Sequence, residues 1–486
     1  MKYLFLFFSI FCLPLLHSCK NDIGDTIHGN YPIDIGKIIT YNCATSGCHN
    51  SQSYQAAAGL NLSSWNDLFL GSNNGSPVIP YNSSFSSLCY FTNTYFELGS
   101  QNLPTMPLNQ KPLPYDDVRK IKAWVDNGAP DVNGKVMWSD QPTRKKLYAV
   151  NQGCDMVTVF DAITQLPMRC INVGNKIGPD TPHQIKVSAD GKYWYVLFVN
   201  NNVLQKFRCT DDAHVADIPL TPKAAGTGPD DATDWNTLTI TNDGKRAYCV
   251  SWTGSGKIAA VDLEKNKLIH YLGGQYFPHG IALNKQEDKL YVTAQTGNFM
   301  TAIDTSFSTA TQFWLSGVGV NYSSLLDPHD IILSPDGENF LVTCQKSNEV
   351  RVYNIAQNKV THVIPTGVFP QEIVYSKSTG QYYVSCTNDS VSFPNSFGVI
   401  TKIDGTSYGA VKLKCGFQPH GIAVDESAKL IYVLSRNISS SGPLPHHTSQ
   451  CVGRNGFVNF VDLSTFSLLP KKYELSVDPY YIHARP

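Results

Sequence analysis

Residues 278–304 read PHGIALNKQEDKLYVTAQTGNFMTAID and contain three short strand-like phrases. The first is Pro278 to Ile281, the second is Leu290 to Val292, and the third is Met300 to Asp304. Each phrase is rich in aliphatic or aromatic residues, and polar residues separate the phrases, as turns separate strands. This stretch therefore predicts a run of short β-strands that follow one another along the chain.

The same phrases recur from Lys145 onward with a period of about 40–60 residues. The tyrosine-rich phrase occurs seven times, at residues 147–150, 195–197, 247–250, 290–292, 340–342, 382–384 and 431–433. The phrase after it also occurs seven times, at residues 157–161, 203–207, 258–262, 300–304, 350–353, 400–404 and 458–462. The proline phrase precedes the tyrosine-rich phrase six times, and its seventh copy stands at the end of the chain, at residues 479–482.

A repeat of this length built only from strands predicts a β-propeller. Because the last proline phrase lies at the C-terminal end, it can complete the blade begun at Lys146 and remove the open sheet edge. We therefore predict an all-β, seven-bladed propeller over residues 144–486, closed by the C-terminal strand. The repeats resemble those of the bacterial propellers with Tyr-Val-rich repeats, the YVTN type, over this whole range.

The proline phrase is predicted to form the innermost strand of each blade, so the residue after the proline position should face the central channel. The seven residues there are all polar: His183, Asn236, His279, His329, Gln371, His420 and Tyr480. Imidazoles that converge on one axis can bind copper, zinc or iron. The structural alternative is that each imidazole hydrogen-bonds to a neighbouring blade. The candidate metal ligands of the channel are therefore His183, His279, His329 and His420.

A second motif lies near the N-terminus, where residues 43–49 read CATSGCH. Two cysteines with a histidine directly after the second are typical of c-type haem attachment. The thiols form thioethers with the haem, and the histidine is the proximal iron ligand. The usual spacing has two residues between the cysteines, whereas Cys43 and Cys48 are separated by four. A local disulfide and half of a zinc site are the alternatives.

Further along the chain, residues 103–108 read LPTMPL and place Met106 between two prolines. Ligation of iron by histidine and methionine is the pattern of cytochromes c. A helix is predicted for residues 115–125, because acidic residues begin it and Asn127-Gly128 ends it. Its apolar residues recur at helical spacing and form one stripe: Val118, Ile121, Trp124 and Val125.

Residues 31–135 resemble the small monohaem cytochrome c domains that are fused to other modules in bacterial envelope proteins. The matching features are the motif at residues 43–49, the methionine loop and the closing helix that runs to Gly128-Ala129-Pro130. The resemblance implies a small all-α domain with one covalent haem c. It also implies the site residues, with two thioether links and two axial iron ligands: Cys43 and Cys48, then His49 and Met106.

The N-terminal residues indicate export from the cytoplasm. Tyr3 to Leu16 is an apolar run that is too short to span a bilayer, and residues 16–19 read LHSC, which resembles the bacterial lipobox. We expect a signal peptide over residues 1–18, a lipid on Cys19 and a tether over residues 19–30. The expected location is the bacterial cell envelope, lipid-anchored on the periplasmic side or at the outer-membrane surface. A plain secretory peptide is the alternative.

The chain has 13 cysteines. Cys344 and Cys386 share one repeat position, where other copies carry alanine or serine, so we expect small buried residues there. An exported protein can form disulfides, and the sequence does not pair the remaining candidates: Cys89, Cys154, Cys170, Cys209, Cys249, Cys415 and Cys451. A long insertion at residues 437–456, in the last blade, contains His446 and His447. We expect it to be a solvated loop or a cap over the channel.

Charge excludes one class of partner. The chain has 38 basic and 39 acidic residues and a formal net charge of −1, so it lacks the basic excess that nucleic-acid binding requires. We predict an exported c-type cytochrome fused to a propeller, which transfers electrons to a redox partner protein or small molecule. In one alternative, the propeller is a redox enzyme with a histidine-bound channel metal fed by the haem. In the other, the chain is a non-redox ligand-binding lipoprotein with a disulfide between Cys43 and Cys48.

Overall fold

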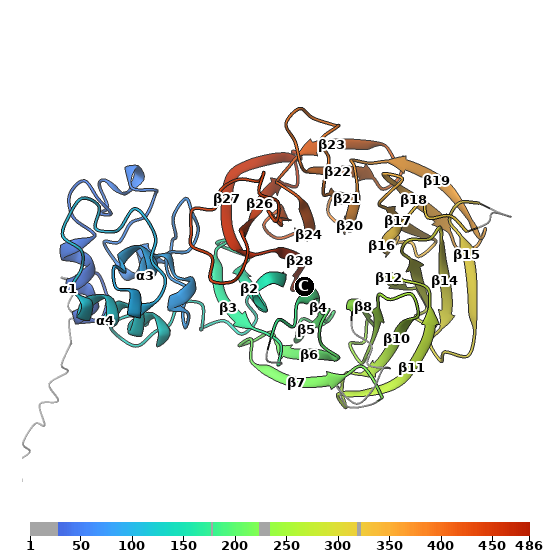
Figure 1. The fold of residues 1–486 in the computed structure, drawn as a ribbon, viewed down its shortest axis with the longest axis horizontal. Helices are drawn as coiled ribbons and strands as arrows, with labels where there is room; N and C mark the ends of the chain where they lie inside the picture. The colour runs from blue at the N-terminus through green and yellow to red at the C-terminus, as the bar shows by residue number, and fades with distance from the viewer. Residues whose placement is uncertain (1–27, 176–177, 223–233, 318–321) are drawn as a thin grey trace, which may run out of the picture.

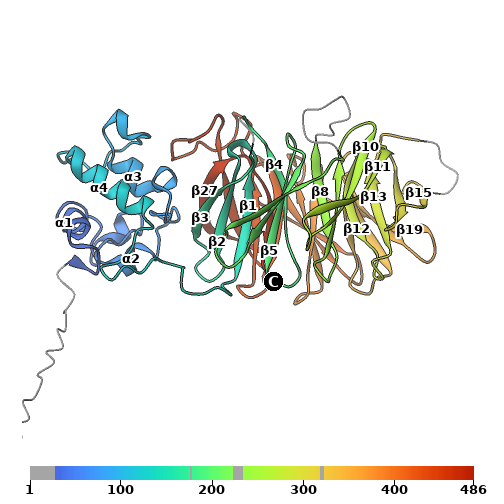
Figure 2. The same cartoon turned by 90° about the horizontal axis from the view of Figure 1, so that it is seen from below.

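The computed structural model describes residues 28–175, 178–222, 234–317 and 322–486. The described chain has a helical part, residues 28–138, and a ring of β-sheets that begins at Lys146 (Figure 1). Seen from the side, the sheets form a flat disc, and the helical part lies beside the rim of this disc (Figure 2). None of the helices in the described residues is long and apolar enough to cross a membrane.

The helical part contains short helices joined by loops. Its α-helices are α1 (Ile33–Asn42), α2 (Trp65–Leu68), α3 (Ser87–Thr92) and α4 (Tyr115–Asp126), and single 3₁₀ turns form at Tyr54–Ala56, Ser83–Phe85 and Phe96–Leu98. The helix predicted at residues 115–125 is confirmed as α4, and its four stripe residues are buried. Gly128 has a φ of +96° directly after this helix, a conformation that glycine adopts without strain.

The ring consists of seven four-stranded antiparallel sheets, counted over the described residues. From the inner strand outward, the first blade contains β28 (Pro479–Ala484), β1 (Lys146–Asn151), β2 (Met156–Asp161) and β3 (Pro167–Asn172). The second contains β4 (Pro182–Val187), β5 (Tyr193–Phe198), β6 (Val203–Arg208) and β7 (His214–Pro219). The third contains β8 (Trp235–Ile240), β9 (Arg246–Ser251), β10 (Gly256–Asp262) and β11 (Lys267–Gln275).

The remaining four blades follow in the same order. The fourth contains β12 (Pro278–Leu283), β13 (Lys289–Ala294), β14 (Phe299–Asp304) and β15 (Ala310–Trp314). The fifth contains β16 (Pro328–Leu333), β17 (Asn339–Cys344), β18 (Glu349–Asn354) and β19 (Lys359–Pro365). The sixth contains β20 (Pro370–Ser376), β21 (Gln381–Cys386), β22 (Val399–Asp404) and β23 (Ala410–Lys414). The seventh contains β24 (Pro419–Asp425), β25 (Leu430–Ser435), β26 (Asn455–Asp462) and β27 (Ser467–Val477).

The predicted propeller and its closure are confirmed. The proline phrases form the inner strands, and β28 pairs antiparallel with β1, with Ile482 opposite Ala149. The C-terminal strand therefore completes the blade that β1 begins, and no blade is left with three strands. Because the two ends of the propeller share one sheet, opening the ring requires that β28 separate from β1.

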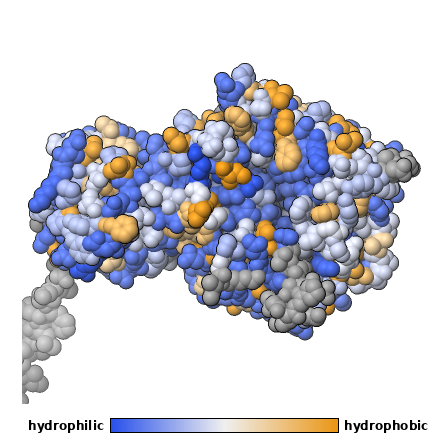
Figure 3. Space-filling model, viewed as in Figure 1, coloured by the Kyte–Doolittle hydropathy of each residue, from blue (hydrophilic) through white to orange (hydrophobic). Residues whose placement is uncertain are grey.

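Apolar side chains fill the spaces between neighbouring blades. The middle strands of the first blade, β1 and β2, are buried along their whole length, and the second strand of every other blade is buried except at its first residue. Aromatic residues contribute much of this core: Trp194 stacks on Phe207 with ring centroids 3.8 Å apart, and Phe160 packs against Tyr432 of the seventh blade. The surface differs, since hydrophobic residues on the face shown in Figure 3 are scattered among hydrophilic ones.

The insertion in the last blade contacts the helical part rather than capping the channel, and much of it is exposed, as predicted for a solvated loop: Leu444 by 79% and Val452 by 99%. Asn102 Nδ2 donates to the His446 carbonyl oxygen at 2.7 Å, and Thr448 Oγ1 donates to the Gln101 carbonyl oxygen at 2.8 Å. The His447 ring packs on Tyr90, with centroids 5.4 Å apart. The insertion therefore holds the helical part at the side of the ring.

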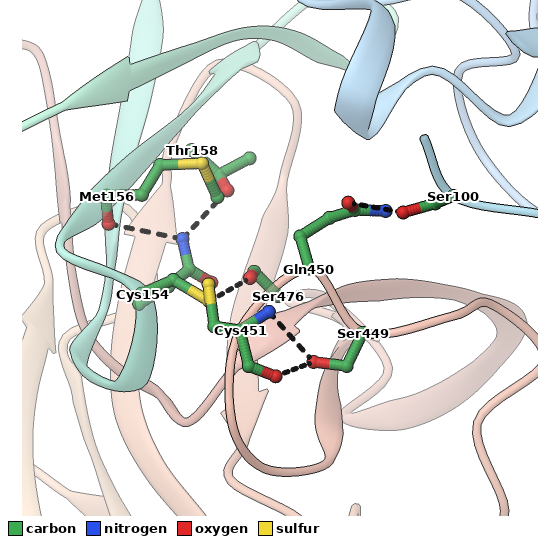
Figure 4. The surroundings of a disulfide bond; sticks show 9 residues. Ser100, Cys154, Met156, Thr158, Ser449, Gln450, Cys451 and Ser476 are labelled. Carbon is green, nitrogen blue, oxygen red and sulfur yellow. Dashed lines mark hydrogen bonds between the residues drawn. A yellow bond between two sulfur atoms is a disulfide. The ribbon is translucent and has the colours of Figure 1, made fainter. Parts of the chain in front are cut away.

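A disulfide joins this insertion to the first blade (Figure 4). Cys154, in the turn between β1 and β2, bonds to Cys451, and the two residues are 297 positions apart in the sequence. Both cysteines were among the disulfide candidates predicted from the sequence, which did not assign their partners. Cys344 and Cys386 are buried free thiols, as predicted. The disulfide connects the first and last blades, which are also the blades that β28 helps to join.

We expect the Cys154→Ser/Cys451→Ser double variant to lose about 2–5 kcal/mol of unfolding free energy, because a crosslink between distant residues restricts the unfolded chain. Denaturant titration of the oxidised wild type and the variant measures this loss. The variant should not respond to reductant, whereas reductant should destabilise the wild type. Equal stability of the two oxidised proteins would contradict a stabilising role of the disulfide.

Candidate functional site

The predicted haem motif forms a closed loop at the C-terminal end of α1. Cys43 caps this helix, and the backbone N–H of His49 donates to the Cys43 carbonyl oxygen at 3.1 Å. Within the loop, the Cys48 N–H donates to the Thr45 carbonyl oxygen, also at 3.1 Å. Gly47 has a φ of +78°, which favours glycine at this turn. The loop therefore holds both thiols and the His49 ring at one end of α1.

The orientation of the His49 ring is set by a backbone contact. Its Nδ1 lies 3.0 Å from the Leu60 carbonyl oxygen. A carbonyl oxygen only accepts hydrogen bonds, so Nδ1 carries the proton and Nε2 carries the lone pair. Burial lowers the pKa of His49, so the ring is neutral near pH 7. A neutral imidazole whose Nδ1 donates to a carbonyl is the form in which histidine binds metal ions.

The two cysteines of the motif are free thiols. Cys43 is 5% exposed and belongs to the apolar core of the helical part. Burial, and the nearby Cys48, raise the pKa of the Cys43 thiol to about 12. A thiol in this environment stays uncharged at neutral pH. The apolar surroundings of Cys43 also suit an uncharged thioether.

Met106 lies on a separate loop that is held against α3. Its backbone N–H donates to the carbonyl oxygen of Phe91 at 2.8 Å, and its side chain is half-buried. Two apolar neighbours are largely exposed: Leu103 by 81% and Leu108 by 52%. The structure thus brings Cys43, Cys48 and His49 together and places Met106 on another loop. The predicted signal peptide, the predicted lipidation site at Cys19 and the predicted tether up to residue 27 lie outside the described residues.

The channel histidines converge as the repeat positions predict. Ring centroids are 3.9 Å apart for His279 and His329, and 5.9 Å apart for His329 and His420. Tyr480 completes the group: its ring lies 3.8 Å from that of His420 and 4.4 Å from that of His183. Four inner strands and the closing strand β28 therefore present their aromatic side chains to one another around the axis.

Most of these imidazoles make the hydrogen bonds expected of a structural role. His279 Nδ1 lies 3.3 Å from the His329 carbonyl oxygen, and His420 Nδ1 lies 3.0 Å from the Tyr480 carbonyl oxygen. His329 differs from the others. Its Nδ1 contacts Gln295 Nε2 at 3.3 Å, whereas its Nε2 is buried without a hydrogen-bond partner among the described residues.

Burial makes all four imidazoles neutral near pH 7. It lowers the pKa of His183 to about 3 and that of His329 to about 4, and it holds the pKa values of His279 and His420 well below 6.5. Neighbouring rings add to the lowering of the pKa for His183, His279 and His420, whereas the charges of Asp330 and Asp327 oppose it for His329. The ring thus offers lone pairs and N–H donors, without positive charge.

Glu372 is a channel residue that the sequence analysis missed. Its Oε1 lies 3.6 Å from His329 Nε2 and 3.8 Å from a ring nitrogen of His420, Nδ1. Burial raises the pKa of Glu372 to about 7. Within the described residues, His329, Glu372 and His420 form the one group of three potential metal ligands whose donor atoms lie within 4.8 Å of one another. His183 and His279 are outside this group.

The reason for the omission is a β-bulge in the inner strands. In β20, Pro370 pairs with Cys386 and Ile373 pairs with Val384, so three steps along β20 match two along β21. Strict alternation would direct Gln371 and Glu372 to opposite faces, and only Gln371 was assigned to the channel. The sequence does contain a signal for Glu372. In two proline phrases an acidic residue directly follows the channel residue, Asp330 after His329 and Glu372 after Gln371.

Hydroxyl groups on the second strand of three blades hold these bulges. Thr343 Oγ1 accepts a hydrogen bond from the Asp330 N–H at 2.9 Å and donates to the Gln371 carbonyl oxygen of the next blade at 2.8 Å. Thr293 and Ser385 make equivalent pairs of bonds, and their acceptors in the next blade are the carbonyl oxygens of His329 and His420. Each hydroxyl therefore fixes the bulge of its own blade and the ring residue of the next.

A cavity of about 620 Å³ lies against the inner strands, and its lining includes Gln184, Lys186, Asp330, Ile373 and Tyr481. Lys186 Nζ donates to the Tyr481 hydroxyl at 2.7 Å. Burial and the negative charge of Glu372 raise the pKa of Asp330 to about 7. The cavity is thus lined by two lysines, Lys186 and Lys377, and by the weakly acidic carboxyl of Asp330.

The fold and this channel define the chain as a seven-bladed β-propeller that carries an N-terminal helical part. No family model matches the chain, and no curated protein matches it by sequence.

Solved structures resemble the chain in fold. A functionally unknown protein from Desulfotomaculum acetoxidans aligns with a TM-score of 0.51 and 14% identity, covering 70% of this chain and 98% of that one. A candidate 6-phosphogluconolactonase from Bacteroides fragilis gives 0.51 and 14%, covering 71% and 99%. The hydrazine synthase of Kuenenia stuttgartiensis gives 0.49 and 15%, covering 64% and 91%. At 14% identity, the two alignments with a TM-score of 0.51 support the propeller fold alone.

We expect Thr343→Val to lower the unfolding free energy by about 2–4 kcal/mol, because the change preserves the shape of the side chain and leaves a buried N–H and a buried carbonyl without this partner. Denaturant titration measures the loss. The matched control is Thr311→Val, on the exposed outer strand β15, which should change stability by less than about 0.5 kcal/mol. Equal effects of the two substitutions would contradict the role assigned to the Thr343 hydroxyl.

Proposed function

We propose that this chain is an exported c-type cytochrome in which the helical part binds one covalent haem c and transfers electrons beside the propeller. The observation that carries the proposal is the loop at the end of α1. It holds two free thiols in the same motif as His49, and the Nδ1 of His49 contacts the Leu60 carbonyl oxygen. Cys43 and Cys48 are the proposed thioether positions, and His49 and Met106 the proposed axial ligands. The bound haem would supply one-electron redox chemistry.

The donor groups fit this assignment. The His49 Nδ1 contact at 3.0 Å leaves Nε2 as the ligand nitrogen, as a proximal histidine requires. The buried environment of Cys43 favours an uncharged sulfur, which a thioether provides. Leu103 and Leu108 flank Met106 with exposed apolar surface that a haem face would cover.

The alternatives drawn from the sequence have less support. A simple binding lipoprotein was expected to pair Cys43 with Cys48, whereas the disulfide in the described residues joins Cys154 and Cys451. Half of a zinc site at the motif would need further ligands, and within the described residues the one group of three potential metal ligands that lie close together is in the propeller channel.

The propeller supports the proposed redox site through the insertion at residues 437–456. The insertion binds residues 100–102 directly, a few positions before Met106. We propose that the propeller holds the methionine loop in place and offers a docking surface to a redox partner protein or small molecule. A lipid on Cys19 would anchor the chain in the bacterial cell envelope.

Protein matured in a host that makes c-type cytochromes should retain one haem per chain after denaturation, detected by its pyridine haemochrome. The Cys43→Ala/Cys48→Ala variant should lose the covalent haem signal, because no thioether can form. Cys170→Ala is the control and should keep the haem. A wild type without covalent haem, with the protein folded, would refute the proposal.

We expect Met106→Ala to keep the covalent haem and to lower its midpoint potential by on the order of 100 mV, since methionine ligation raises haem potentials and axial ligands span about 0.8 V. Redox titration followed by absorbance measures the shift. Met137→Ala, outside the loop, should leave the potential unchanged. Equal potentials of the Met106 variant and the wild type would exclude Met106 as a ligand.

A further inference from the structure

Three side chains meet at the propeller axis without hydrogen bonds to one another: His329, Glu372 and His420. Glu372 Oε1 lies 3.6 Å from His329 Nε2 and 3.8 Å from His420 Nδ1, and both distances are too long for hydrogen bonds. Ligand atoms around a small tetrahedral cation are about 3.3 Å apart, because each lies about 2.0–2.1 Å from the metal. The spacing between Glu372 Oε1 and His329 Nε2 is therefore close to that of a ligand set, and the His420 ring lies beside both, with its Nδ1 3.8 Å from the carboxylate.

The three side chains are also almost completely buried. Their exposed fractions are 3% for His329, 5% for Glu372 and 2% for His420. His329 Nε2 has no hydrogen-bond partner among the described residues. A buried polar atom without a partner costs free energy, so this nitrogen requires a partner that the protein chain does not supply.

We propose that His329, Glu372 and His420 bind one divalent transition-metal ion at the axis of the propeller. Two neutral imidazoles and one carboxylate suit zinc or iron(II), and three protein ligands leave a coordination position open for water or substrate. The carboxylate would also compensate part of the charge of the cation. This inference does not depend on the haem proposal, since its residues belong to β16, β20 and β24.

The surroundings of both histidines allow the tautomers that a metal requires. His420 Nδ1 faces the Tyr480 carbonyl oxygen at 3.0 Å, so it carries the proton and Nε2 is the available donor. His329 Nδ1 faces the amide of Gln295, whose oxygen and nitrogen can exchange places by rotation of the amide.

That rotation is supported by a chain of amides. Gln295 contacts Gln345 at 3.1 Å, and Gln345 contacts Gln371 at 2.7 Å, so the three amides can turn together and keep their mutual hydrogen bonds. The turned chain offers an oxygen to His329 Nδ1–H and leaves the Nε2 lone pair for the cation. We therefore assign Gln295 as a positioning residue of the site.

The cavity lies next to this site, although none of the three ligand residues lines it. Its lining includes Asp330 and Ile373, the chain neighbours of His329 and Glu372, and Ile422, two residues after His420. A volume of about 620 Å³ is within the range of small-molecule sites. Because Lys186 also lines the cavity, a small anionic or polar molecule is the class of ligand that fits beside the metal.

Metal binding to the full-length protein tests the proposal. After treatment with chelator, the protein is titrated with Zn²⁺, with Fe²⁺ under anaerobic conditions, and with Cu²⁺, and bound metal is counted apart from haem iron. We expect one equivalent to bind and the melting temperature to rise with metal concentration. Failure of all three ions to bind would overturn the proposal.

Single substitutions identify the ligands. His329→Ala, Glu372→Gln and His420→Ala should each lower the affinity by more than about 100-fold, and Gln295→Leu by about 10–100-fold, as loss of an outer-shell partner does. His183→Ala is the matched control, since this histidine belongs to the ring and lies outside the ligand group. Unchanged affinity in the three ligand variants, or an equal loss in His183→Ala, would overturn the assignment.

X-ray absorption of the zinc-loaded wild type keeps the test independent of variant folding. We expect two imidazoles and a carboxylate oxygen at about 2.0–2.1 Å. A sulfur ligand would place the metal at a cysteine and overturn the proposal. The Cys43→Ala/Cys48→Ala variant should bind zinc as the wild type does, so failure of the haem proposal and failure of this one are distinguishable.

Discussion

The arrangement of the channel depends on one recurring constraint, a β-bulge in each inner strand, which in three blades is held by a hydroxyl of the adjacent strand. Thr343 shows the principle, because its Oγ1 satisfies the Asp330 N–H exposed by the bulge and also binds the Gln371 carbonyl of the next blade. One side chain thus sets the local bend and the position of the neighbouring blade. Without it, two buried backbone groups would lose a partner, which native proteins avoid.

Closure of the ring depends on contacts between the two ends of the propeller sequence. β28 completes the first blade, and the disulfide between Cys154 and Cys451 joins the same blade to the insertion of the last one. The insertion in turn packs on the helical part through His446, His447 and Thr448. A single region therefore closes the propeller and fixes the proposed haem-binding part beside it.

The proposed haem site and the proposed channel metal site prepare their histidines in the same way. Burial keeps His49 and the channel histidines neutral, and a carbonyl oxygen beside Nδ1 selects the tautomer of His49 and of His420. Neutral imidazoles with a defined free nitrogen are prepared to bind a cation at little cost in reorganisation. The channel adds a carboxylate, Glu372, and the helical part adds two thiols.

The sequence by itself determined the number of blades, the order of their strands, the closing strand and helix α4, because each follows from local periodicity or a repeated phrase. It also brought Cys43, Cys48 and His49 into one motif, since seven consecutive residues can form a single loop. Only the tertiary structure decided the partner of Cys154, the contacts of the insertion and the place of Glu372. These features depend on residues far apart in the chain, or on a bulge that breaks the two-residue alternation from which strand faces are predicted.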